Sequence, residues 1–69
     1  MRDVEVTGEV INLQQLLQLA GVVDTGGEAK NLIGTLAVFV NGEPESRRGR
    51  QLHAGDEVLV GDETLKIAG

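Results

Sequence analysis

The chain has 69 residues, 41% of them hydrophobic, and a formal net charge of −5. This length suffices for one domain over residues 1–69, and the acidic balance excludes adhesion to nucleic acid or anionic lipid over the whole surface. The composition holds no cysteine, Trp or Tyr, which excludes disulfides and thiolate metal sites and argues against RNA modules that stack bases on aromatic rings.

A short strand is predicted near the start of the chain, where Val4 and Val6 alternate with polar residues. We expect this strand to end at Gly8 and Glu9. We also expect it to join the sheet formed by later strands, because an unpaired strand leaves its backbone groups without partners.

Two helices follow in succession. Asn12 and Thr25 are good N-caps, and each has Gln or Glu three positions on, as in a capping box. The first helix is expected to end at Gly21, and the second to run from about residue 26 to Gly34. Their inward faces are predicted from apolar residues at helical spacing, namely Leu13, Leu16, Leu17, Ala20, Ala29, Leu32 and Ile33.

The second half of the chain carries the signals of strands linked by tight turns. Asn41-Gly42 is a strong hairpin turn, segment 44–51 is polar and expected to be irregular, and Leu52 returns to the core. Further strands are expected at residues 37–40, 57–60 and 64–67. The sequence therefore predicts an α+β domain in which two consecutive helices pack on a small antiparallel sheet of four to five strands.

Catalysis is not expected. The single histidine, His53, stands just before a turn, with no Ser, Cys or carboxylate at a spacing typical of a catalytic group. The carboxylates are scattered over turns and helix starts, where they cap and solvate, and no spacing of His, Asp and Glu indicates a metal site. We therefore assign no catalytic residue, no metal and no cofactor.

Two glycines, Gly26 and Gly27, open the second helix and leave its first N–H groups accessible at the positive end of the helix dipole. Lys30 lies one turn further along, so a phosphate would reach amides and ammonium together, and Asn31 is its outward-facing neighbour. A plain turn that uses glycine for its backbone freedom explains the same residues equally well, and Glu28 opposes an anion there.

Arg47, Arg48 and Arg50 are three of the six basic residues, and the remaining sequence has three positive and eleven negative residues. Arginine carries a rigid fork that matches phosphate oxygens. This local concentration of charge is typical of an anion-binding device, and nucleic-acid phosphate is the expected anion.

The alternative for the same run is a solvated loop whose arginines pair with neighbouring carboxylates. The candidates for such pairing are Glu43, Glu45 and Asp56. Exposed pairs of this kind contribute little to stability.

Several short motifs stand in a characteristic order: Leu13-x-x-Leu16-Leu17, Gly21, Ala29-x-x-Leu32-Ile33, Val38-x-Val40-Asn41-Gly42, and Gly55-Asp56 before Val58. Together they resemble the S4 RNA-binding domain, whose fold is also called the αL motif, over about three quarters of the chain. Two further motifs look like the short, single-domain bacterial members: Thr25-Gly26-Gly27-x-Ala29-Lys30 and Glu45-Ser46-Arg47-Arg48-Gly49-Arg50.

This resemblance implies a non-enzymatic module that binds structured RNA, ribosomal RNA among the candidates, through the two helices and the adjoining loop. The residues expected to bind RNA are Lys30, Arg47, Arg48, Arg50, Gly26, Gly27 and Asn31. The chain departs from many S4 domains, which carry arginines in place of the two glycines, a basic residue near Gly34, a glycine in place of Leu36 and often a Lys in place of Gln51. These departures point to weak affinity or to binding within a larger assembly.

We expect a ribosomal or RNA-processing protein as a further partner, and a monomer as the state of this chain. No apolar run has the length of a membrane span, and the start Met1-Arg2-Asp3 is unlike a signal peptide. We therefore expect a cytoplasmic protein with no membrane partner.

Two other readings stay open from the sequence. Residues 38–60 are also similar to β-grasp sulfur carrier proteins, which use a Gly-Gly tail, although the sequence here ends Ile67-Ala68-Gly69. In the other reading, the chain is a protein-binding adaptor whose arginine run meets an acidic partner.

Overall fold

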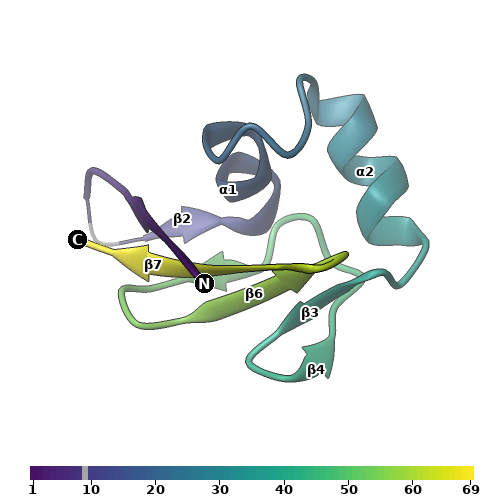
Figure 1. Ribbon diagram of the computed structural model, residues 1–69. Coiled ribbons are helices and arrows are strands. Elements are labelled where there is room, and N and C mark those ends of the chain that lie inside the picture. The colour runs from purple at the N-terminus through teal and green to yellow at the C-terminus, as the bar shows by residue number, and fades with distance from the viewer. Residues whose placement is uncertain (9) are drawn as a thin grey trace.

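The computed structural model describes residues 1–8 and 10–69; Glu9, where the first strand is predicted to end, lies outside the described residues. Both helices lie on the same side of the main sheet (Figure 1). The elements in chain order are β1 (Arg2–Glu5), β2 (Ile11–Asn12), α1 (Leu13–Leu19), α2 (Gly26–Gly34), β3 (Val38–Val40), β4 (Glu43–Pro44), β5 (Gln51–Leu52), β6 (Glu57–Val60) and β7 (Glu63–Ala68).

The predicted helix caps are confirmed. The Asn12 side chain accepts a hydrogen bond from Gln15 N at 2.8 Å, and the Gln15 side chain accepts one from Asn12 N at 3.1 Å, which completes the capping box. Thr25 caps α2 by accepting from Glu28 N at 3.1 Å. Gly21 follows α1 with a φ of 76°, a left-handed conformation that glycine adopts without strain.

The main sheet has the strand order β1-β7-β6-β3-β4. The chain turns from β3 into β4 at Asn41 and Gly42, whose φ values of 51° and 87° are those of the predicted tight hairpin turn. Segment 44–51 is irregular between its ends, since only Pro44 and Gln51 belong to strands, β4 and β5.

One strand pair departs from the predicted antiparallel sheet. β1 joins the sheet as expected, but it runs parallel to β7, with Val4 opposite Ile67, so the sheet is mixed. A parallel pair needs a long crossover, and here the whole chain between β1 and β7, both helices included, supplies it. Nothing in the few residues of β1 records the direction of a partner at the other end of the chain.

The core lies between the helices and the sheet. Buried apolar residues of the described chain form one cluster, to which the helices contribute Leu13, Leu16, Leu17, Ala29 and Ile33. The strands contribute alternate residues, such as Val58 and Val60 of β6, so the opposite face of the sheet is open. In the described part of the chain, no helix combines the length and the apolar character needed to cross a membrane.

Candidate nucleic-acid interface

Residues 45–50, which we call the Arg loop, are held against the start of α1 by backbone hydrogen bonds. Leu13 N donates to Arg50 O at 2.9 Å, and Gln14 N donates to Arg48 O at 3.0 Å. The first N–H groups of a helix have no acceptor inside the helix, so the carbonyl groups of the loop satisfy two of them. The loop is therefore fixed in position by a helix that lies beside it in space but far from it in sequence.

The side chain of Glu45 holds the Arg loop from the other side. Its Oε2 accepts from Ser46 N at 3.0 Å, from Arg47 N at 3.1 Å and from Arg47 Nε at 3.1 Å. Its Oε1 accepts from Arg47 Nη2 at 3.2 Å and from Arg50 Nη1 at 2.6 Å. Two guanidinium groups and two backbone amides thus converge on one carboxylate, which Arg47 contacts bidentately.

Glu45 is buried, with 6% of its surface exposed. No other charged residue in the described part of the chain is buried. The hydrogen bonds from Arg47 and then from Arg50 lower the pKa of Glu45 to about 2, against the desolvation that burial brings. The carboxylate is therefore ionised at any physiological pH. Its negative charge cancels one of the positive charges of the loop.

The predicted basic residues differ in whether a carboxylate neutralises them. Arg47 and Arg50 share the carboxylate of Glu45, so these three residues together carry +1. Arg48 and Lys30 are exposed, and within residues 1–8 and 10–69 no carboxylate forms an ion pair with either of them. The alternative considered from the sequence, in which the arginines pair with a neighbouring carboxylate, is therefore confirmed for Arg47 and Arg50, whose partner is Glu45.

The start of α2 is linked to the Arg loop through Gln14. A Cβ placed on Gly26 would lie 2.7 Å from Gln14 Nε2, so the Gln14 side chain packs directly against this glycine. Gln14 also bonds the loop through its backbone N–H, as described above. Gly26 and Lys30 are four residues apart and therefore share one flank of α2.

The accessible amides at the start of α2 are fewer than the sequence indicated. Glu28 N donates to the Thr25 side chain, and Ala29 N donates to Thr25 O. For the amides of Gly26 and Gly27, the described residues supply no acceptor. The Glu28 carboxylate accepts from Thr25 Oγ1 at 3.3 Å, which keeps a negative charge beside this helix start.

Asn31 lies on a different flank of α2 from Lys30. With Glu28, Leu32 and Thr35 it lines a shallow hollow against the α1–α2 connection at Val22 and Val23. Asn31 is rotated by about 100° from Lys30 about the helix axis, and the hollow that Asn31 lines does not include Lys30. Of the predicted site residues, Gly26 and Lys30 are therefore brought toward the Gln14 contact, whereas Asn31 is not.

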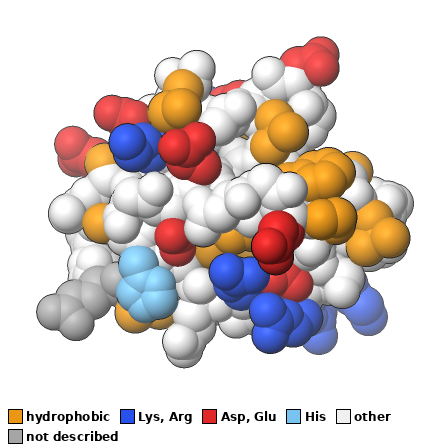
Figure 2. Space-filling model, turned by 90° about the horizontal axis from the view of Figure 1, so that it is seen from below, with side chains coloured by type: hydrophobic (Ala, Val, Ile, Leu, Met, Phe, Trp, Pro, Cys, Tyr) orange, Lys and Arg blue, Asp and Glu red, His pale blue; other side chains and the backbone are white. Residues whose placement is uncertain are grey.

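The underside of the sheet gives a view of the charge distribution. Figure 2 shows most of the visible Lys and Arg side chains gathered at one part of this face beside Asp and Glu side chains, with another Lys or Arg side chain lying apart from them among Asp and Glu. The positive charge is thus local on a chain whose net charge is −5. An anionic partner would be attracted to one edge of the molecule and repelled by much of the rest.

Comparison with known proteins shows which family the chain belongs to. A family model described as the S4 domain matches residues 4–68. The chain belongs to the S4-domain family. This S4 domain is also 46% identical over 57 residues to a Bacillus subtilis (strain 168) protein described as "Probable ribosome maturation protein RlbA", and the alignment covers 83% of the chain and 80% of that protein.

The S4 match includes residues 38–60, the stretch that also resembles sulfur carriers, and it confirms the predicted family and fold. Membership points to a non-catalytic RNA-binding family. The sequence named Glu45 only as one of three possible partners of the arginines, and it did not indicate Gln14 as a residue that positions the Arg loop. The signal for Glu45 was a negative charge just before the arginine run, which it shared with Glu43, and Gln14 looked like an ordinary polar position on a helix.

Proposed function

We propose that this protein is a non-enzymatic RNA-binding module that docks structured RNA through contacts with the phosphate backbone. Lys30, Arg47, Arg48 and Arg50 would make these contacts, with the amides of Gly26 and Gly27 beside them. The S4 family supports an RNA partner. The relative named as a probable ribosome maturation protein favours ribosomal RNA, or a precursor of the ribosome, as the target and a cytoplasmic site of action.

The observation that carries the proposal is the way Glu45 fixes the Arg loop. A guanidinium has five N–H donors. Arg47 gives two side-chain donors to Glu45 and Arg50 gives one, so most of their donors remain available to a ligand. Because both groups are already held in place, less side-chain entropy is lost when a phosphate binds.

Arg48 and Lys30 supply the charge that Glu45 does not cancel. Gln14 links the two segments that carry them, because its side chain packs against Gly26 and its backbone N–H donates to Arg48 O. The predicted interface is therefore an edge formed by the Arg loop, the start of α1 and one flank of α2. Asn31, on the next flank of α2, would contact RNA only at the margin of this edge.

The test is a double substitution, K30Q/R48Q, in a binding titration with labelled bacterial ribosomal RNA. Neither residue forms an ion pair within the described chain, so both can be changed without exposing a buried charge. For the unchanged protein, three or four phosphate contacts correspond to a slope of log affinity against log salt of roughly −2 to −4. In K30Q/R48Q we expect affinity to fall at least about tenfold at low salt and the slope to become shallower by about 2.

The matched control is K66Q, which removes one positive charge from the exposed Lys66 on β7, where Asp3 and Glu57 are its strand neighbours. Circular dichroism melts should be alike for the three proteins. Binding that is unaffected by K30Q/R48Q, or that K66Q reduces equally, would remove the proposed interface. Tight binding with no salt dependence would favour a partner other than a phosphate backbone.

A further inference from the structure

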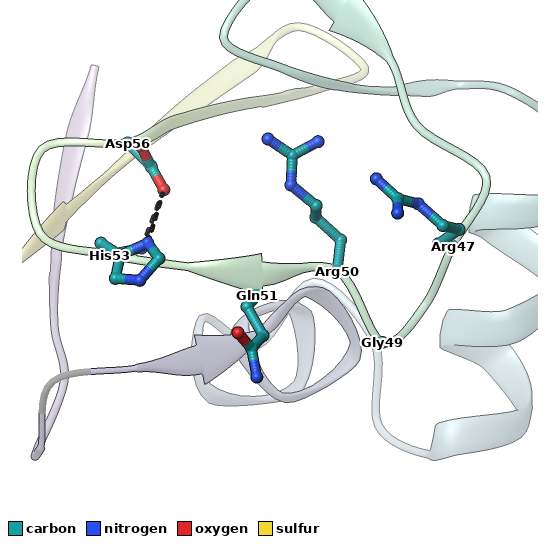
Figure 3. Close-up of a pocket in the computed structure, with 6 residues that line it drawn as sticks. All are labelled: Arg47, Gly49, Arg50, Gln51, His53 and Asp56. Carbon is teal, nitrogen blue, oxygen red and sulfur yellow. Dashed lines mark hydrogen bonds and ion pairs between the residues drawn. The ribbon is translucent and has the colours of Figure 1, made fainter.

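A cavity of about 700 Å³ opens beside the Arg loop. It is lined by Arg47, Gly49, Arg50, Gln51, His53 and Asp56. Arg47 and Arg50 extend to the same side of the loop, and Asp56 lies across from them on the next turn, whereas Gln51 points away to the other side of β5 (Figure 3). The volume is within the range of about 300–1,000 Å³ that is usual for small-molecule sites.

Asp56 is fixed in this cavity by two neutral donors. His53 N donates to its Oδ2 at 2.8 Å, and Asn41 Nδ2 donates to its Oδ1 at 3.2 Å. Its side chain keeps 25% exposure, and a carboxylate accepts up to about four hydrogen bonds, so it has acceptor capacity left. A carboxylate held in this way would repel a phosphate, and the cavity therefore does not have the lining of a simple anion site.

The cavity instead offers fixed donors at one end and a fixed acceptor at the other. On the Arg side, Arg47 and Arg50 line the cavity, and each keeps N–H groups that do not bond Glu45. Guanine presents O6 and N7 as paired acceptors, for which a bidentate arginine is the commonest specific contact. Guanine also presents N1–H and N2–H donors on the adjoining edge, and these match a carboxylate. Adenine reverses this pattern at position 6, where its amino group would face the guanidinium groups.

We propose that this cavity binds an unpaired guanine base of the RNA, with Arg47 or Arg50 on O6 and N7 and Asp56 on N1–H and N2–H. The proposal rests on the RNA-binding function proposed above and adds base selectivity to it. Arg48, Lys30 and whichever of Arg47 and Arg50 does not contact the base would bind phosphates and position the strand, and the cavity would recognise one base.

The imidazole of His53 supplies a flat surface at the same end of the cavity. Its side chain is 61% exposed and its Nδ1 lies 3.9 Å from Asp56 Oδ2. Unstacked RNA bases pack on histidine rings and on guanidinium planes as well as on larger aromatic rings. One base can therefore stack here even though the chain has no Trp or Tyr.

The experiment is a titration of ¹⁵N-labelled protein with GMP, AMP, CMP and UMP, followed by amide chemical shifts. All four carry the same phosphate, so differences among them report the base. We expect GMP to shift amides in residues 49–56 and to bind at least tenfold more tightly than AMP. In D56N the preference for GMP over AMP should fall at least fivefold, while D62N, which changes the exposed Asp62 on the β6–β7 turn, should keep it.

IMP refines the same test. It lacks the N2 amino group but keeps O6, N7 and N1–H, so its affinity should lie between those of GMP and AMP. Equal shifts from all four nucleotides, or shifts that avoid residues 49–56, would overturn the guanine site. That result would leave salt-dependent RNA binding through Lys30 and Arg48 untouched, so the two proposals fail separately.

Discussion

Replacing Glu45 with glutamine tests whether a buried carboxylate holds the Arg loop in place. The amide side chain of E45Q would keep one carbonyl acceptor but place an NH₂ group among donors: the backbone N–H groups of Ser46 and Arg47 and the Arg47 guanidinium. Hydrogen bonds to a charged group contribute about 1.5–3 kcal/mol. We therefore expect E45Q to lower the free energy of unfolding substantially.

The lowered pKa of Glu45 gives the size of the expected loss in the free energy of unfolding. A fall from 4.5 to about 2 corresponds to roughly 3 kcal/mol of stabilisation at neutral pH. Arg47 is 71% exposed, so solvent screens its share, and we expect a loss of about 2 kcal/mol for E45Q. For a domain of this size, such a loss lowers Tm by roughly 10 °C.

The way in which this stabilisation depends on pH follows from the lowered pKa of Glu45. Because the folded protein has the lower pKa, the stabilisation is fully present above pH 4.5 and is lost as pH falls toward about 2. The stability difference between the natural chain and E45Q should therefore be constant from pH 7 to 5 and then shrink. Urea unfolding must be followed by far-UV circular dichroism, since the chain has no Trp or Tyr.

Two results would refute this reasoning. One is a difference below about 0.5 kcal/mol at pH 7, which is the size expected of an ordinary surface substitution. The other is a difference that stays the same at pH 7 and pH 2.5. As a control, E43Q removes a carboxylate from the exposed Glu43, which forms no ion pair within the described residues, and it should change stability little at either pH.

Two further predictions concern backbone conformation. Leu36 has a φ of 60°, a left-handed conformation that costs a non-glycine residue about 1–2 kcal/mol, so L36G should stabilise by about 0.5 kcal/mol after the larger entropy of unfolded glycine is deducted. Urea unfolding measures the effect, and L36A, which keeps the strain, should bring no gain. In G27A the new Cβ would lie 3.9 Å from Thr25 Oγ1, so we expect about 0.5 kcal/mol of added helix stability together with several-fold weaker RNA binding, because the methyl group crowds the accessible amides. Unchanged RNA affinity in G27A would remove Gly27 from the interface.

Signals between residues close together in the sequence were sufficient to predict most of the helices, strands and turns. The caps at Asn12 and Thr25 and the turn at Asn41-Gly42 depend on contacts between residues at most three or four positions apart, and all three are confirmed. The same holds for strand alternation in β6, where neighbouring residues face opposite sides of the sheet. The order of such motifs also identified the S4 family.

The sequence predicted where the positive charge of the candidate site lies, but it did not predict which side chains pair with one another there. The run of Arg47, Arg48 and Arg50 is visible in the sequence, and its exposure follows from its polarity. Which arginines are neutralised is not visible, because eleven carboxylates were available as partners and the fold selects one by burying it. The sequence therefore could not separate Arg48 from its neighbours.

The sequence by itself determined where the chain forms helices and tight turns and where its positive charge is concentrated, because each depends on residues close together in the chain. It also indicated the family, through the order of short motifs along the chain. Only the tertiary structure decided that β1 lies parallel to β7, that Glu45 is enclosed by two arginines, and that Gln14 joins α2 to the Arg loop. The long-range contacts arise when the helices and the sheet bury a common core, and that packing sets distances which no local pattern records.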